Sequence, residues 1–291
     1  NGNNYLDIAE INRTSITGSF KVNNPKYRLK HLLTTSLLFD KKYLSPFTFS
    51  YSLKREFHNH FNLYFNAGKV YRFPTINDLF WNPGGNLNLV PEQGYTGDIG
   101  IIWNKKIHKV IFSFEPSLYS RWIDNWILWQ PTGSFWSPMN VKKVWNRGLE
   151  TSSKVHFINK KITYDFTLKT AYNLSTNIEV YNSNNNSQDK QLIYTPHYKL
   201  VFKSQISYKE FTFTYLHNYT GYVFTSRDNE NFLPSFNLGR LFLSCRVKFK
   251  NNSAKIFYKI NNLYNTNYQV VMNRPMPLIN HEIGINFKIN K

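Results

Sequence analysis

Few residues of this sequence stand in patterns that bind metals or perform catalysis. His58 and His60 form a His-x-His pair, a spacing that metal sites use, but no third ligand lies nearby in the sequence. The pair also falls at an expected short turn, which favours a solvated turn. The sequence contains no Gly-x-Ser-x-Gly, no phosphate-binding glycine loop and no His-Glu-x-x-His. We therefore expect no catalytic residues, no bound metal and no cofactor, although distant strands could still bring an enzyme site together.

Tryptophans gather around one segment of the chain and could stack on a ligand. They are Trp122, Trp126, Trp129, Trp136 and Trp145. Tryptophan at the ends of membrane-spanning strands usually forms an interfacial girdle, and this reading is favoured for Trp122, Trp126 and Trp145. Trp129 and Trp136 fall within an expected loop and remain open to both readings.

Arginines supply the second kind of candidate binding residue. Arg121, Arg147, Arg227 and Arg240 could hold an anionic substrate, although arginines that line a lumen mostly meet water or neighbouring loops. The candidate ligand-binding residues are Trp81, Asn82, Trp129, Trp136, Arg121 and Arg227.

The chain is strongly basic, with a formal net charge of +19. A nucleic-acid-binding protein is disfavoured, because the basic residues are spread along the whole chain and no recognition helix or RNA-binding motif is present. The charge instead reflects lysines at turns and lumen-facing positions, and it could also favour anionic lipid headgroups or an anionic ligand.

The elements that must position these residues are β-strands. Aromatic residues reach 18%, with 20 Tyr and 24 Phe, and apolar and polar residues alternate over many short stretches. The clearest example runs from Leu241 to Phe249, where Cys245, the single cysteine, lies on the apolar side. The alternation predicts about 13 strands, near residues 11–22, 29–39, 47–54, 61–73, 98–107, 110–129, 142–159, 162–172, 200–208, 211–219, 241–249, 254–260 and 283–289.

Short turns and long loops alternate between these strands. Short turns are expected near His58, Lys105, Lys160, Lys209 and Asn251. Long loops are expected at residues 74–94, 130–141, 181–191, 226–237 and 271–277. This asymmetry is typical of a transmembrane antiparallel β-barrel with short periplasmic turns and long extracellular loops, whereas a soluble sandwich has no reason to sort its loops by length.

The longest of the loops, from Lys69 to Glu92, contains three prolines and two adjacent glycines. Proline removes backbone donors and Gly84-Gly85 favours a tight turn, so neither a helix nor a central strand is expected here. Loops of this length in compact proteins are usually functional.

This loop resembles a segment of the TonB-dependent outer-membrane receptors, in which Arg-x-Pro-Thr leads to an acidic-Leu-aromatic step, a Gly-Asn and a Leu-x-Pro-Glu. The matching residues are Arg72, Pro74, Thr75, Asp78, Leu79, Phe80, Gly85, Asn86, Leu89, Pro91 and Glu92. Two further stretches are similar to later parts of the same barrels, namely Asn146–Glu150 and the region from Ile260 to Pro277. Arg72 is expected to be mainly scaffold, and Asp78 and Glu92 could pair with it or cap turns of the loop.

The resemblance implies an all-β transmembrane barrel of about 22 strands around an N-terminal plug. Residues 1–291 are then expected to be the C-terminal part of one such barrel domain, without the plug. The implied function is active uptake of a metal chelate, a ferric siderophore or cobalamin, across the outer membrane of a Gram-negative bacterium. The implied partners are the TonB complex, acting through the plug, and outer-membrane lipid; no nucleic acid is expected. A passive porin-like channel and, less favoured, an outer-membrane enzyme remain alternatives.

Overall fold

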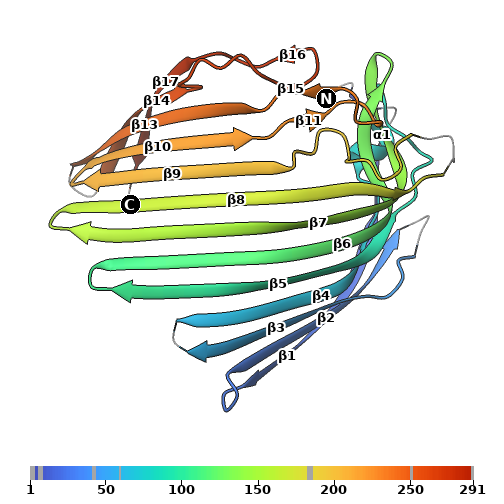
Figure 1. The fold of residues 1–291 in the computed structure, drawn as a ribbon, viewed down its shortest axis with the longest axis horizontal. Helices are drawn as coiled ribbons and strands as arrows, with labels where there is room; N and C mark the ends of the chain where they lie inside the picture. The colour runs from blue at the N-terminus through green and yellow to red at the C-terminus, as the bar shows by residue number, and fades with distance from the viewer. Residues whose placement is uncertain are drawn as a thin grey trace.

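The structure, a computed structural model, describes residues 4–5, 9–40, 44–58, 60–181, 186–249 and 252–289. Within these ranges thirteen strands form one antiparallel sheet, in which neighbours in sequence are neighbours in space (Figure 1). The order is β1 to β10, then β13, β14 and β17. The predicted all-β fold and its strand number are therefore confirmed. The described part of the chain contains no helix with the length and hydropathy needed to cross a membrane.

The strands of the sheet lengthen toward its middle. Their bounds are β1 Arg13–Asn24, β2 Leu29–Asp40, β3 Thr48–His58, β4 Phe61–Arg72, β5 Glu92–Ile107, β6 Val110–Thr132, β7 Phe135–Asn159, β8 Ile162–Glu179, β9 Tyr198–Tyr208, β10 Phe211–Thr220, β13 Phe236–Phe249, β14 Asn252–Asn261 and β17 Asn280–Lys288. Two small hairpins lie in the long connections, β11 Val223–Phe224 with β12 Phe232–Leu233, and β15 Gln269–Val271 with β16 Arg274–Pro275.

The two faces of the sheet differ in chemistry because side chains alternate along each strand and paired residues share a face. One face carries apolar rows, for example the row formed in turn by Phe65, Ile99, Leu118, Leu149 and Tyr172. The first four of these side chains are exposed in the chain itself, Leu118 at 56%, and Tyr172 is half-buried. The large apolar area is what lipid covers in a membrane barrel, and we call this side the outward face.

The inward face is polar and hydrogen-bonded. The row beside the previous one contains Asn66, Asp98, Tyr119 and Asn173. Asn66 Nδ2 donates to Asp98 Oδ2 over 2.8 Å, and the Tyr119 hydroxyl donates to Asn173 Oδ1 over 2.7 Å. Cross-strand polar pairs of this kind are typical of a barrel lumen rather than of a packed core.

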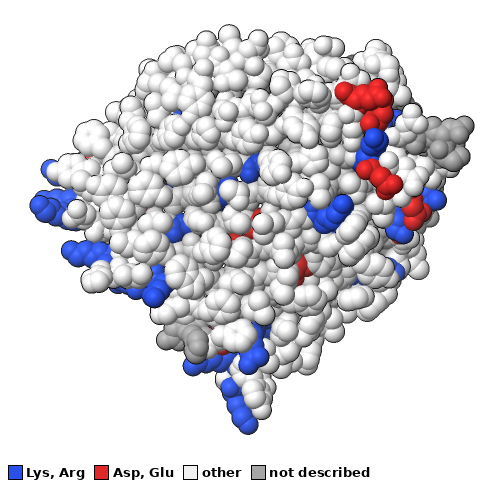
Figure 2. Space-filling view, viewed as in Figure 1, with Lys and Arg blue, Asp and Glu red and all other residues white. Residues whose placement is uncertain are grey.

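One end of the sheet has tight two-residue turns. His108, Lys160 and Lys209 open three of them with φ near +50°, the left-handed conformation that such hairpins require. Figure 2 shows Lys and Arg side chains gathered at this end of the strands. The prediction of a turn at Lys105 and Lys106 was wrong by a few residues, because β5 continues to Ile107. The expected turn near Asn251 involves residues 250–251, outside the described ranges.

The other end carries the long connections, with two corrections to the predictions. Residues 130–141 are not a loop, since β6 and β7 pair up to Thr132 and Phe135 and leave only Gly133-Ser134 as the turn. The Pro and Gly content that suggested a loop is accommodated within a long hairpin. The loop after β4 contains a short helix, α1 Ile76–Phe80, where none was expected. Residues 182–185 of the expected polar loop lie outside the described ranges.

Among the described residues the ring is open. β1 pairs only with β2 and β17 pairs only with β14. An odd number of antiparallel strands makes β1 and β17 run in the same direction.

Candidate functional site

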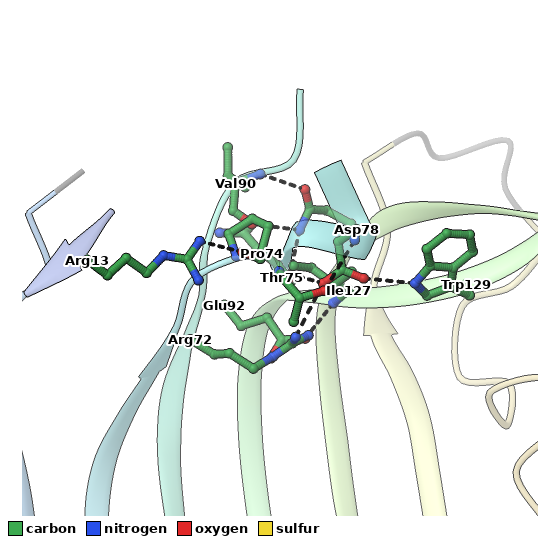
Figure 3. A network of polar contacts seen from close by, with 11 residues as sticks. Arg13, Arg72, Pro74, Thr75, Asp78, Val90, Glu92, Ile127 and Trp129 are labelled. Atoms are coloured by element: carbon green, nitrogen blue, oxygen red, sulfur yellow. Dashed lines mark hydrogen bonds and ion pairs between the residues drawn. The ribbon is translucent and has the colours of Figure 1, made fainter. Parts of the chain in front are cut away.

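The residues of the loop motif converge on one polar network at the long-connection end of the sheet (Figure 3). Arg72, the last residue of β4, donates from Nε and Nη2 to the two carboxylate oxygens of Glu92, over 2.6 and 2.7 Å. Its Nη1 lies 3.5 Å from Asp78 Oδ2. The hydrogen bonds that Arg72 donates to Glu92 raise the pKa of Arg72, and burial partly opposes this shift. This bidentate pair fastens the two ends of the loop together.

Asp78 organises the short helix. Thr75 is the N-cap of α1, and its hydroxyl accepts from the Asp78 N–H while Asp78 accepts from the Thr75 N–H. This reciprocal capping box stabilises a helix of a single turn. Asp78 is only 5% exposed and its other oxygen, Oδ1, accepts from Trp129 Nε1 over 2.8 Å. A buried carboxylate with three kinds of partner makes Asp78 the centre of the network.

The loop is fastened to the tip of the β6–β7 hairpin, which bends over beside α1 (Figure 1). Glu92 Oε1 accepts from the Ile127 N–H, and Asn86 Nδ2 donates to the Pro138 carbonyl. Asn140 contributes most: its side chain accepts from the Val90 N–H and donates to the Val90 carbonyl, each over 3.0 Å. Sequence reasoning missed Asn140, since an asparagine in a presumed loop carries no distinguishing signal.

Two glycines allow this close approach. A Cβ on Gly84, whose φ is +117°, would lie 2.1 Å from the Trp136 carbonyl oxygen. A Cβ on Gly85 would lie 2.6 Å from both the Leu79 carbonyl oxygen and the Trp81 nitrogen. The backbone contacts at the turn after α1 therefore require residues without a side chain.

Apolar residues of the motif are buried beneath the loop and hold it against the sheet. Leu89 is 1% exposed, and Pro74 and Pro91 are buried. Arg13 of β1 donates to the Pro74 carbonyl and also pairs with Asp40 over 2.8 Å. The motif residues thus form a scaffold that links β1, β4, β5 and the β6–β7 hairpin.

The tryptophans predicted to bind ligand each contact another part of the chain. Trp129 uses its indole N–H to hydrogen-bond Asp78. Trp81 packs edge-on against Tyr5, with ring centroids 5.9 Å apart, and Asn82 beside it is exposed. Trp136 packs against Tyr194 of the β8–β9 connection at 5.1 Å.

A cavity of about 230 Å³ lies between the β6–β7 hairpin and the β8–β9 connection. Arg227 reaches it from the β11–β12 hairpin and is exposed, with Nη2 3.8 Å from Met139 Sδ. Lys142 and Lys190 line the same cavity, together with the apolar residues Leu128, Met139, Val141, Leu192 and Ile193. The cavity could accommodate part of a ligand that is apolar and anionic.

Arg121 lies elsewhere. It lines a second cavity of about 270 Å³ on the inward face, with Asn146, Glu150, Asn173 and Lys199. The structure therefore does not bring Arg121 and Arg227 into one site, although both face regions open to solvent in the described chain.

A cluster of charges at the end of β8 and beside it on β7 was not predicted. Lys142 and Lys143 both pair with Glu179, over 3.3 and 3.2 Å. The hydrogen bonds from these lysines lower the pKa of Glu179, and the bond to Glu179 raises the pKa of Lys143. In the described residues, no group of three or more His, Cys, Asp or Glu side chains lies close enough to hold a metal ion.

An open antiparallel sheet with lipid-suited outward rows, a polar inward face and its long connections fastened at one end defines a β-barrel protein of the outer membrane. The family described as TonB dependent receptor-like, beta-barrel, matches residues 10–263. The chain belongs to this family, whose members reside in the outer membrane of Gram-negative bacteria.

Relatives cover parts of the chain. The vitamin B12 transporter BtuB of Vibrio vulnificus is 32% identical over 87 residues, which are 29% of this chain and 14% of the transporter. BtuB of Photobacterium profundum is 30% identical over 108 residues, 35% of this chain and 17% of that protein.

Solved structures share the fold over nearly the whole chain. The copper transporter OprC aligns with a TM-score of 0.72 at 16% identity, covering 95% of this chain and 47% of its own. A mutant of the ferric enterobactin receptor PfeA of Pseudomonas aeruginosa aligns with a TM-score of 0.68 at 14% identity, covering 94% and 44%. The chain therefore spans less than half the length of these receptors.

Proposed function

We propose that the chain serves as barrel wall in a receptor that actively imports a metal chelate across the outer membrane. The observation that carries the proposal is the family match over residues 10–263 together with the loop scaffold centred on Asp78. The scaffold keeps a large extracellular segment in one conformation, and a rigid rim is what a receptor needs to bind a scarce ligand with little loss of entropy.

The chemistry of the rim supports this substrate class. The cavity beside Arg227 offers apolar walls with three cationic side chains, those of Arg227, Lys142 and Lys190. A metal chelate with a large organic frame and acidic or phosphate groups fits this combination. Ferric siderophores and cobalamin both meet the description, and the similarity to vitamin B12 transporters favours testing cobalamin first.

Active uptake requires energy from outside the barrel. In this proposal the TonB complex supplies it through a plug domain, and the part of the chain described here binds substrate and surrounds the path.

The test is uptake of labelled chelate by whole cells. Cells that express the receptor should accumulate radiolabelled cobalamin or ferric siderophore, and deletion of TonB should reduce accumulation to the level of receptor-free cells. Uptake that continues without TonB would indicate a passive channel and overturn the proposal. A small neutral sugar that crosses by general porins provides the control for membrane integrity.

A further inference from the structure

Aromatic residues border the outward face at both ends of the strands. Toward the long connections, Tyr95, Trp122 and Trp145 form one row across β5, β6 and β7, which we call the aromatic row. Toward the short turns, Tyr208 is the last residue of β9 and is exposed. Tyrosine and tryptophan are enriched at both membrane–water interfaces, so these positions mark the two headgroup regions. Because the short turns of outer-membrane barrels face the periplasm, Tyr208 lies at the periplasmic leaflet.

A shallow depression of about 540 Å³ lies beside Tyr208. It opens on the outward face, because side chains alternate along β9 and Tyr208 therefore has the same side as Tyr198. Tyr198 pairs with Tyr172, which belongs to the apolar outward row. Lipid covers this face in the membrane, so the occupant of the depression is part of a lipid molecule.

The depression is hollow where Cys245 lies. This residue stands between Phe211 of β10 and Ile256 of β14 in one row across the sheet. Both neighbours are large and exposed, at 60% and 45%, whereas the thiol side chain is small. Phe213 and Leu243, in the next row toward the middle of the membrane, also line the depression. The depression therefore offers apolar walls to a hydrocarbon chain that enters from the periplasmic side.

The β9–β10 turn brings two opposite charges to this end of the sheet (Figure 1). Lys209 Nζ lies 5.3 Å from the centre of the Tyr208 ring, and that ring lines the depression. Glu210 follows Lys209 in the same turn, and both residues are exposed. Among the residues that the structure describes, neither side chain forms an ion pair. The turn thus presents a cation and an anion next to an apolar hollow, at the level of the lipid headgroups.

We propose that the depression binds phosphatidylethanolamine of the periplasmic leaflet, with the lipid phosphate at Lys209, the lipid ammonium at Glu210 and an acyl chain over Cys245. The periplasmic leaflet of an outer membrane consists of phospholipid, and this zwitterionic headgroup carries the two charges that complement the turn. An ammonium donates charge-assisted hydrogen bonds to a carboxylate, which the trimethylammonium of phosphatidylcholine cannot do. The proposal rests on the outer-membrane position of the chain and is independent of the substrate that the receptor imports.

The test compares phospholipids that differ only in headgroup. Receptor containing this chain is purified in detergent, incubated with an equimolar mixture of phosphatidylethanolamine, phosphatidylcholine and phosphatidylglycerol with identical acyl chains, and weighed by native mass spectrometry. The wild type should retain phosphatidylethanolamine about threefold over each of the other two lipids, the size of effect that an exposed charge pair produces. Glu210→Gln should abolish the preference over phosphatidylcholine, and Lys209→Gln should lower the retention of all three lipids.

Further variants separate shape from charge and from folding. Cys245→Leu fills the hollow and should lower the retention of phosphatidylethanolamine, whereas Cys245→Ala keeps the hollow open and should retain the lipid as the wild type does. Lys109→Gln removes a cation from the β5–β6 turn, which does not border the depression, and should leave retention unchanged. Folding of each variant is checked by its shifted mobility in unheated gel electrophoresis.

Three results would overturn the proposal. The first is equal retention of the three lipids by the wild type. The second is a preference for phosphatidylethanolamine over phosphatidylcholine that persists in folded Glu210→Gln, since the carboxylate would then have no part in selecting the headgroup. The third is equal retention by folded Cys245→Leu and Cys245→Ala, which would show that the acyl chain does not enter the hollow.

Discussion

At the scale of single residues, the carboxylate of Asp78 holds the loop between Arg72 and Glu92 together. Asp78 accepts from the Thr75 backbone, from Trp129 Nε1 and, at a longer distance, from Arg72. The Thr75 N–H and Trp129 Nε1 lose this acceptor if the carboxylate is removed, whereas Arg72 keeps its pair with Glu92. The motif is thus explained by structural need, without assigning ligand contacts to its polar residues.

Replacing Asp78 by alanine should therefore open the loop. Each donor left without an acceptor costs up to about 1–3 kcal/mol, the value for a buried group, and this substitution leaves two part-buried donors, the Thr75 N–H and Trp129 Nε1. Hydrogen exchange of the amides in residues 73–91 should accelerate by at least tenfold, while exchange in the central strands stays unchanged. Asp228→Ala is the control, because that carboxylate accepts only within its own loop. Equal exchange in both variants would contradict the role given to Asp78.

Glu179 gives a pH dependence whose sign follows from its lysine partners. Its pKa is lowered, so the stabilisation it provides is fully present above the ordinary glutamate value of about 4.3 and is lost as the pH falls through the lowered value. Lys143→Gln should move the titration midpoint of Glu179 upward, toward the ordinary value. Carboxyl-carbon NMR of the labelled protein measures that midpoint, and a midpoint that stays fixed in the variant would argue against the pairing.

At the scale of elements, the contact between the motif loop and the β6–β7 hairpin decides how the extracellular end is built. Gly84 touches the Trp136 carbonyl, and Asn140 pairs with both backbone groups of Val90. The hairpin strands extend well beyond the aromatic row to make these contacts. An element that begins as a membrane strand thus ends as part of the extracellular rim.

Gly84→Ala should detach the loop from the hairpin. Its positive φ and the 2.1 Å approach of an added Cβ to a backbone oxygen leave no room for a methyl group. The free energy of unfolding should therefore fall by more than about 1 kcal/mol. Gly133→Ala is the matched control, since φ is +68° there but no atom lies within 4 Å of the added Cβ. Protease cleavage within residues 73–91 should be faster in Gly84→Ala than in Gly133→Ala. Similar rates would mean that backbone strain alone, without the clash, accounts for the effect.

The sequence predicted the strands far better than the ends of the strands. The alternation along Leu241–Phe249 predicts which side chains point outward, and the register of β13 with β14 agrees at each residue. Residues 130–141 were misjudged because Pro131, Pro138 and Gly133 suggest a loop, whereas an extended hairpin tolerates prolines that need not donate to a neighbour. Arg147 pairs with Ser120 and Leu174 on the outward face, a position that its charge alone does not indicate. Contacts such as Asn140 with Val90 join residues 50 apart, and no local pattern encodes them.

At the scale of the whole molecule, the two edges of the sheet govern behaviour. β1 and β17 each leave one side of the backbone unpaired within the described residues, and both run in the same direction. Hydrocarbon cannot satisfy free N–H and C=O groups, so these edges demand partner strands. Edge strands of two copies can pair antiparallel about a twofold axis, β1 with β1 or β17 with β17.

The 291-residue chain refolded alone in detergent should therefore associate. Light scattering after size-exclusion chromatography is expected to give masses of two or more chains, because pairing of copies removes the unpaired edges. Hydrogen exchange locates the contact: amides of β1 or β17 should become protected as association increases, while the central strand β7 is protected throughout and serves as the internal control. A monodisperse monomer whose β17 amides exchange as slowly as those of β7 would mean that the edges close on each other, despite their parallel direction.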